Sequence, residues 1–447
     1  MRTILTGGVV VTCDAEARVL SGDVLLEGSK ILEIGAGPEL KATRAGQRGL
    51  TRLLDATGAA VIPGLVQAHV HLCQVLFRGM ADDMPLLTWL KTRIWPLEAA
   101  HDAASLRASA ELGLLETMLA GTTTLLDMGT VHGYEEVFAA CDRAGMRVVG
   151  GKTMMDVGDG VPKGLRESTK ASLVESDALM DAFCKDPGGR LSYAFAPRFI
   201  LSCSEKLVRG AVERAKARGA LVHTHAAEHA GEREAVRAAL GEDDIAILRK
   251  WGVRGTNAVL AHGVQLTDAE ARALAEEGTR VVHCPSANLK LGSGIARVAE
   301  LDRLGVQLAM GADGAPCNNN LDPWTELRHA ALLAKVRTGV TTLPAERAFR
   351  LATIDGARAL GLADRVGSIE VGKRADLAVV RLDGPHVEPG GDVYSRLVYA
   401  CTARDVTDVF VDGVHVVRGG EHARLDRDAV LARARTQAKR VAQRAGI

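Results

Sequence analysis

Val61-Ile62-Pro63-Gly64-Leu65-Val66-Gln67-Ala68-His69-Val70-His71 is the most informative stretch of the chain. It is an apolar, β-branched run that ends in two histidines at positions i and i+2. Side chains at these positions leave the same face of a strand, and neutral imidazole is a common nitrogen ligand of zinc and related metals. We therefore interpret the stretch as a strand whose end provides half of a metal site, with a chance pair of histidines as the alternative.

Length and composition favour a soluble protein with one large and one smaller domain. The chain has 447 residues, of which 47% are hydrophobic and 25% charged, with 55 Lys plus Arg against 55 Asp plus Glu. A balanced charge gives no support for binding to nucleic acid or to a membrane surface. The start, Met1-Arg2-Thr3-Ile4, lacks the apolar segment of a signal peptide. We therefore expect a cytoplasmic protein that binds neither nucleic acid nor membrane.

The middle of the chain alternates short apolar strands with longer helical patterns. This order predicts an α/β fold, a (β/α)8 TIM barrel, because parallel strands buried on both sides read as continuous apolar runs. The expected barrel strands are residues 60–66, 123–128, 147–151, 191–196, 221–225, 257–261, 279–283 and 307–311.

Both ends of the chain are rich in β-type patterns and turn residues. Examples are residues 4–12 near the start and residues 408–418 near the end, where Asp412-Gly413 is typical of a hairpin turn. We therefore expect one small, discontinuous β-sandwich domain, formed by residues 1–58 and 367–447 with a terminal helix, and a barrel hydrolase domain formed by residues 59–366.

Polar residues stand at the predicted ends of four barrel strands, where barrel enzymes place their catalytic groups. Three histidines and an aspartate suit a mononuclear Zn²⁺ or Fe²⁺ site, while a further glutamate and histidine are placed to act on water. His223 shares a face with His225 and competes with it as a ligand, and His283 is interpreted as structural. The candidates at the strand ends are His69, His71, His225, Glu228, His262 and Asp313.

Taken together, these motifs resemble the amidohydrolase superfamily. The likeness rests on Pro63-Gly64, His69-x-His71, His225-x-x-Glu228, Ala261-His262 and Gly311-x-Asp313, and it extends to residues 367–376. Within the superfamily the chain is most similar to the branch of guanine, S-adenosylhomocysteine, methylthioadenosine and 5′-deoxyadenosine deaminases and triazine hydrolases. The resemblance implies one divalent metal, with Zn²⁺ ahead of Fe²⁺, held by His69, His71, His225 and Asp313.

The resemblance also implies a hydrolytic deamination. Hydroxide attacks an amino-bearing ring carbon, and Glu228 carries a proton from the water to the adjacent ring nitrogen. His262 holds and polarises the attacking oxygen. Asp313 passes the remaining proton to the leaving amine, so that two carboxylates divide the acid–base work and ammonia is released.

The residues expected to bind substrate favour two different answers. Trp89 offers a flat face for a purine ring, and Glu98 matches the carboxylate that holds ribose hydroxyls in adenosine-type deaminases. Gln74 and Arg198 instead match the pair that binds the polar edge of the purine in guanine deaminases, and an arginine only donates hydrogen bonds. The Gly-rich segment 156–169, which includes Arg166, is either a loop that reaches a ribose tail or a solvated connector.

The leading interpretation is a deaminase of an adenosine derivative such as 5′-deoxyadenosine, methylthioadenosine or S-adenosylhomocysteine. Guanine or a pterin is the second candidate substrate, and an s-triazine that loses an amine or chloride is the third. A barrel that stores a ligand or a metal without turnover is the non-enzymatic alternative. The partners expected are a small heterocyclic substrate and water, and the resemblance implies a homodimer or a higher homo-oligomer.

Overall fold

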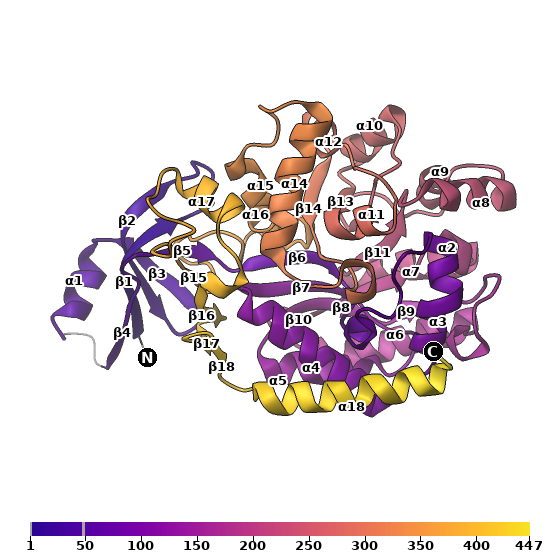
Figure 1. The fold of residues 1–447 in the computed structure, drawn as a ribbon, viewed down its shortest axis with the longest axis horizontal. Coiled ribbons are helices and arrows are strands. Elements are labelled where there is room, and N and C mark those ends of the chain that lie inside the picture. Colours follow the sequence, from indigo (N-terminus) through magenta and orange to yellow (C-terminus); the bar gives the residue numbers. More distant parts are fainter. Residues whose placement is uncertain (1, 47–49) are drawn as a thin grey trace.

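A computed structural model describes residues 2–46 and 50–447, and its centre is a nearly closed barrel of eight parallel strands (Figure 1). A single parallel bridge between Val70 and Asp313 joins the first and last strands. The predicted (β/α)8 barrel is therefore confirmed. In spatial order the strands are β14 (Gln307–Met310), β13 (Arg280–His283), β12 (Ala258–His262), β11 (Leu221–Ala226), β10 (Leu191–Pro197), β8 (Arg147–Gly151), β7 (Thr122–Met128) and β6 (Leu65–Val70), and β9 (Thr153–Met154) pairs with β10.

The barrel strands are buried on both faces because helices cover them from outside. Polar side chains start several of these helices by accepting a backbone N–H: Asp102 caps α4, Ser204 caps α7 and Thr267 caps α10. The covering helices include α4 (Ala103–Leu119), α5 (Tyr134–Ala144), α6 (Thr169–Phe183), α7 (Glu205–Arg218), α10 (Asp268–Glu277), α12 (Val298–Arg303), α14 (Pro323–Thr338), α15 (Ala345–Leu351) and α16 (Ile354–Ala359).

A separate mixed sheet, at the left of Figure 1, takes its strands from both ends of the chain. It brings the N-terminal strands and the strands after residue 376 together, as the sequence predicted. The domain boundaries at 58/59 and 366/367 stay a prediction. The strands run in the order β18 (Glu421–His422), β17 (Val414–Arg418), β16 (Val406–Val411), β15 (Leu377–Arg381), β5 (Ala59–Pro63), β1 (Arg2–Val11), β2 (Val19–Glu27) and β3 (Lys30–Gly35), with β4 (Thr51–Asp55) paired to β1.

The segment 60–66, expected to be one barrel strand, is divided between the two sheets. Residues up to Pro63 form β5 of the mixed sheet, and β6 of the barrel begins at Leu65. Gly64 stands at the junction, where a Cβ would lie 2.2 Å from the side chain of Thr123. The chain changes sheets here because glycine lets β7 approach this closely.

A long insertion follows β6 and is braced by the C-terminal helix. It consists of η1 (Leu72–Phe77), α2 (Leu86–Trp89), η2 (Leu90–Ile94) and α3 (Trp95–Ala99). Helix α18 (Arg427–Ala445) runs along α4 and ends near α3 (Figure 1), where its buried Val441 joins an apolar cluster with Phe77 and Leu97. The last helix of the chain therefore supports the segment that borders the site.

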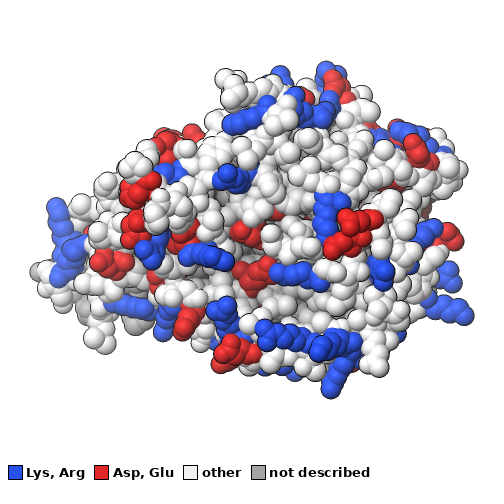
Figure 2. Space-filling model, viewed as in Figure 1, with Lys and Arg blue, Asp and Glu red and all other residues white. Residues whose placement is uncertain are grey.

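The visible surface carries charges of both signs. Figure 2 shows Lys and Arg interspersed with Asp and Glu, with several basic side chains along the lower edge where α18 lies. Within residues 2–46 and 50–447, no helix combines the length and apolar character needed to cross a membrane.

Candidate active site

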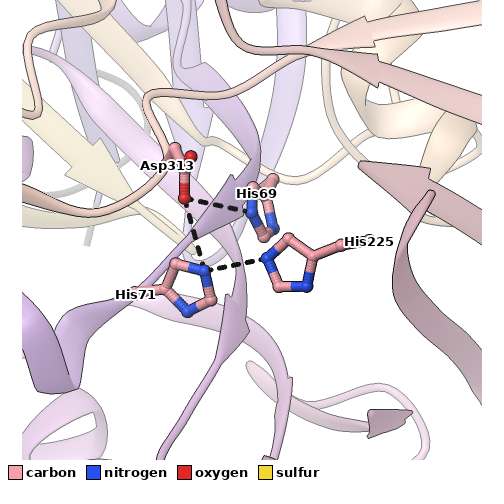
Figure 3. Close-up of side chains that lie close together, drawn as sticks. All are labelled: His69, His71, His225 and Asp313. Atoms are coloured by element: carbon pink, nitrogen blue, oxygen red, sulfur yellow. Dashed lines mark hydrogen bonds and ion pairs between the residues drawn. The ribbon is translucent and has the colours of Figure 1, made fainter. Parts of the chain in front are cut away.

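Four of the predicted residues converge at the C-terminal ends of three barrel strands (Figure 3). His69 lies on β6 with His71 just after it, His225 lies on β11, and Asp313 follows β14. One nitrogen or oxygen atom of each side chain lies within 4.8 Å of those of the others. The Nε2 atom of His71 is 3.2 Å from Nε2 of His225 and 3.3 Å from Oδ1 of Asp313.

Hydrogen bonds on the outer side of the rings fix where the ring protons are. The Nδ1 atom of His71 lies 2.8 Å from the carbonyl oxygen of Met128, and Nδ1 of His225 lies 2.7 Å from that of Arg198. A carbonyl oxygen only accepts, so both Nδ1 atoms donate and both Nε2 atoms of the neutral rings present lone pairs. Two lone pairs that face each other across 3.2 Å beside a carboxylate form an arrangement that a cation stabilises.

His69 is oriented by a chain of two hydrogen bonds through His223. The Nδ1 atom of His223 donates to the carbonyl oxygen of Val259 over 3.0 Å, so its Nε2 accepts from Nδ1 of His69 over 2.8 Å. This leaves Nε2 of His69 as a third inward lone pair, buried and without a hydrogen-bond partner. His223, weighed as a competing ligand, thus lies behind His69, outside the four-residue group.

Burial and mutual charge set the ionisation state of these four residues. Burial lowers the pKa of His69 to about 4 and that of His225 well below its usual value, so both rings are neutral. Burial opposes the charge of Asp313, but the adjacent rings of His69 and His71 hold its pKa well below the usual range. Burial also opposes a charge on His71, yet Asp313 raises the pKa of that ring. Three imidazoles and an ionised carboxylate are the donor set of a Zn²⁺ or Fe²⁺ site.

Glu228 and His262 lie beside this group. The Nε2 atom of His262 is 3.5 Å from Oε2 of Glu228 and 3.8 Å from Oδ2 of Asp313, and it has no hydrogen-bond partner. Nδ1 of His262 is 2.9 Å from Oδ1 of Asn288, which fixes the ring. Burial, together with the charge of Asp313, raises the pKa of Glu228 well above the usual value. A carboxyl group whose pKa is raised in this way suits a role in proton transfer.

A cavity adjoins five of the six residues, and only His69 does not line it. One side of the cavity is polar, and the other is formed by apolar side chains of the insertion and of the loops after β10 and β13. The cavity is lined by His71, Gln74, Leu86, Trp89, Leu90, Arg198, Phe199, His225, Glu228, His262, Leu291 and Asp313.

Three of the predicted substrate-binding residues are bonded to one another. Oε1 of Glu98 accepts a hydrogen bond from Gln74 over 2.8 Å, and its Oε2 accepts one from Arg198 over 2.6 Å. Gln74, Trp89 and Arg198 line the cavity, whereas Glu98 lies behind them and is 2% exposed. Both oxygens of the Glu98 carboxylate are thus engaged by the neighbouring side chains.

The segment 156–169 packs against the insertion. Val161 and Leu165 are buried in the same apolar cluster as Trp89 and Phe199, while Arg166 is exposed. Two of its side chains therefore support the apolar wall of the cavity, and the segment is more than a solvated connector.

Sequence reasoning missed two contributors. Asn288, which orients His262, lies on α11 (Pro285–Lys290) after β13, and no spacing pattern links it to the histidine motifs. The role of His223 behind His69 depends on the pairing of β11 with β12, although its spacing from His225 already placed it on the same face. The remaining predicted residues gather at one end of the barrel.

A (β/α)8 barrel with a histidine and aspartate cluster at its strand ends is typical of the class of metal-dependent barrel hydrolases. The family model described as the amidohydrolase family matches residues 60–416. A 5-methylthioadenosine/S-adenosylhomocysteine deaminase of Halobacterium salinarum is 38% identical over 445 residues, which cover 99% of this chain and 98% of that protein. The chain therefore belongs to the amidohydrolase family.

Solved structures agree with this assignment. A zinc-bound adenosine deaminase from Xanthomonas campestris is 34% identical with a TM-score of 0.92, and the match covers 99% of this chain and 98% of that one. The guanine deaminase of E. coli is 27% identical with a TM-score of 0.82, over 93% of this chain and 98% of that one. The resemblance to this family that the sequence motifs indicated is thus confirmed.

Proposed function

We propose that the protein is a metal-dependent aminohydrolase that deaminates an adenosine derivative and releases ammonia. The observation that carries the proposal is the convergence of three inward imidazole lone pairs and the Asp313 carboxylate next to Glu228 and His262. Relatives named as methylthioadenosine/S-adenosylhomocysteine and adenosine deaminases support the substrate class. The candidates are 5′-deoxyadenosine, methylthioadenosine and S-adenosylhomocysteine.

His69, His71, His225 and Asp313 would hold one divalent ion, with Zn²⁺ preferred over Fe²⁺. The donor set fits either ion, and the zinc bound in the adenosine deaminase favours zinc. When bound, such an ion makes water nucleophilic near neutral pH. Metal analysis of the purified protein is expected to give about one zinc per chain.

The chain's own residues divide the proton transfers. Glu228, whose pKa is raised by burial, takes a proton from the attacking water and gives it to the ring nitrogen next to the reacting carbon. His262, held by Asn288, directs its free Nε2 toward the attacking oxygen. Asp313 receives the second proton on Oδ2, the oxygen that faces His262, and passes it to the leaving amine.

Substrate binding would use the cavity walls. Trp89 offers a face for the purine, and Gln74 and Arg198 offer polar groups at the edge of the ring. Arg198 also holds His225 through its carbonyl oxygen, so substrate binding and the metal site share one residue.

One observation favours a second candidate, guanine or a pterin. In an adenosine-type deaminase Glu98 would bind ribose hydroxyls, but here both its oxygens are engaged by Gln74 and Arg198. A guanidinium donates only, and it suits a substrate carbonyl or an unprotonated ring nitrogen. Because Glu98 is 2% exposed behind these side chains, a nucleoside would have to move Gln74 or Arg198 to reach it, whereas a free base would not. An s-triazine is the third candidate, because the same attack would displace an amine or chloride.

Ammonia release from a panel of nucleosides, guanine, a pterin and an s-triazine discriminates these proposals. We expect turnover of at least one adenosine derivative with the zinc-loaded protein. Activity on guanine with none on any nucleoside would overturn the first choice and support the second. Bound metal without turnover on any compound would favour the non-enzymatic alternative.

Two finer properties belong to this proposal. The family resemblance supports a homodimer or a higher homo-oligomer, which a solution mass measurement tests. The second is a cytoplasmic location, which fractionation of the source cells tests.

A further inference from the structure

The turn that carries Glu228 is held by two buried carboxyl groups that have no place in the proton transfers. Ala227, between β11 and Glu228, has a φ of +51°, in the left-handed region that favours glycine. Its N–H donates to Oδ2 of Asp244, and the N–H of Glu228 donates to Oε2 of Glu232 over 3.2 Å. Two successive backbone N–H groups of a strained turn are thus bound by side chains from two other elements.

Both acceptors lie on helices outside the barrel. Glu232 is on α8 (Ala230–Leu240) and Asp244 is the first residue of α9 (Asp244–Lys250), and each is 1% exposed. A carboxyl group so deeply buried is costly unless it is bonded. Burial, followed by the charges of Asp244 and Glu228, raises the pKa of Glu232 to about 8, which limits its repulsion of Glu228.

A third buried residue fixes Asp244 in turn. Nε of Arg233 lies 3.3 Å from Oδ1 of Asp244, and Nη1 of Arg233 donates to Glu270 over 3.1 Å. Glu270 also closes the capping box of α10 with Thr267. The turn is therefore connected, through Arg233, to the helix that follows β12.

We propose that Asp244 and Glu232 are positioning residues that set the catalytic carboxyl group of Glu228. The inference rests on the proposed function, because it assumes that Glu228 moves protons. By binding the N–H groups of Ala227 and Glu228, the two residues hold the turn in its left-handed form. That form directs the Glu228 side chain toward His262 and the cavity. Without the acceptors the turn relaxes, and Glu228 loses its alignment while the metal ligands keep theirs.

The chain offers a matched control for the test. Asp243, adjacent to Asp244, also forms an ion pair with Arg233 at 3.2 Å, but its side chain is 31% exposed and it does not bind the turn. We compare Asp244→Ala, Asp244→Asn and Asp243→Ala with the wild type. Asn keeps an oxygen acceptor for the N–H of Ala227, so it should rescue the function. If Asp244→Ala fails to fold, Glu232→Ala serves as the second variant, because it leaves the Asp244–Arg233 ion pair intact.

Kinetics and metal content provide the first readout. For Asp244→Ala and Glu232→Ala we expect kcat to fall about tenfold to a hundredfold, the typical cost of a small misplacement of a reacting group. KM and bound metal should stay within about twofold of the wild type, since neither residue touches a ligand or lines the cavity. Asp244→Asn should recover most of the kcat, and Asp243→Ala should retain it. An equal loss in Asp244→Ala and Asp243→Ala, or none in any variant, would overturn the proposal.

Hydrogen exchange of the backbone provides a readout that needs no substrate. The amides of residues 226–229 should exchange faster in Asp244→Ala and Glu232→Ala and at the wild-type rate in Asp243→Ala. Unchanged exchange in the first two variants would show that Asp244 and Glu232 do not hold the turn, even if the enzyme is active. If these two variants exchange faster but even the wild-type protein releases no ammonia, the role of Asp244 and Glu232 in holding the turn is supported while the proposed function is refuted.

Discussion

Three non-glycine residues have a left-handed backbone where the barrel strands meet the site. Ala227, His262 and Asp313 have φ values of +51°, +80° and +63°, and each stands at or just after the end of a barrel strand. Non-glycine residues adopt this conformation only when their surroundings enforce it, and such strain is common at functional sites. The strand ends are thus shaped to direct side chains into the cavity, at a cost that the packed barrel sustains.

Gly311, two residues before Asp313, shapes the site by having no side chain. A Cβ at this position would lie 2.5 Å from the carbonyl oxygen of His69 and 2.7 Å from its nitrogen. The same carbonyl oxygen accepts the N–H of Asp313 over 3.0 Å. The first and last barrel strands can therefore approach only with glycine here, and this approach brings His69 and Asp313 together.

We predict that Gly311→Ala separates these two ligands. The methyl group must displace backbone, which costs about 1–3 kcal/mol or more, and the variant should bind less zinc and melt at a lower temperature. Gly164→Ala is the control, because its Cβ would come no nearer than 3.9 Å to Ala99. Metal analysis and thermal melting of both variants check this. A zinc-replete Gly311→Ala protein with the wild-type melting temperature would contradict it.

At the scale of elements, helix α14 joins the loops that follow the last two barrel strands. Its Glu326 is fully buried, and the carboxyl group accepts hydrogen bonds from the N–H of Ser286 over 3.1 Å and from Asn318 over 2.9 Å. Ser286 lies in the first turn of α11, which carries Asn288, and Asn318 ends α13 (Ala315–Asn318), the short helix after Asp313. One side chain of α14 therefore ties together the supports of His262 and Asp313.

Glu326 should make stability depend on pH. Burial raises its pKa from 4.5 to about 7, so the folded protein binds this proton more tightly than the unfolded chain does. The stabilisation is complete below about pH 4.5 and is lost as the pH rises through 7, roughly 3 kcal/mol in total. In Glu326→Gln this group no longer titrates. We expect the melting temperature of the wild type to fall more between pH 5 and pH 8 than that of the variant, and equal changes would contradict the assignment.

On the scale of the whole molecule, the barrel and the chemistry at its strand ends could be predicted because both leave local patterns. Buried parallel strands read as apolar runs, and His69, His71, His225 and Asp313 stand where those runs stop. The engagement of Glu98 by Gln74 and Arg198 could not be predicted, because it joins the insertion to β10 through three-dimensional packing. The change of sheets at Gly64 was hidden for a similar reason, since the apolar run continues across it.

In the proposed mechanism the histidine–aspartate group binds a metal, while Glu228 transfers protons without holding that metal. Glu228→Gln keeps the size of the side chain and removes its ability to carry a proton. We predict that metal content and ammonia release, measured on the same sample, will show wild-type zinc with turnover reduced by about a hundredfold or more. A zinc-loaded Glu228→Gln protein that deaminates at a near-normal rate would contradict the account.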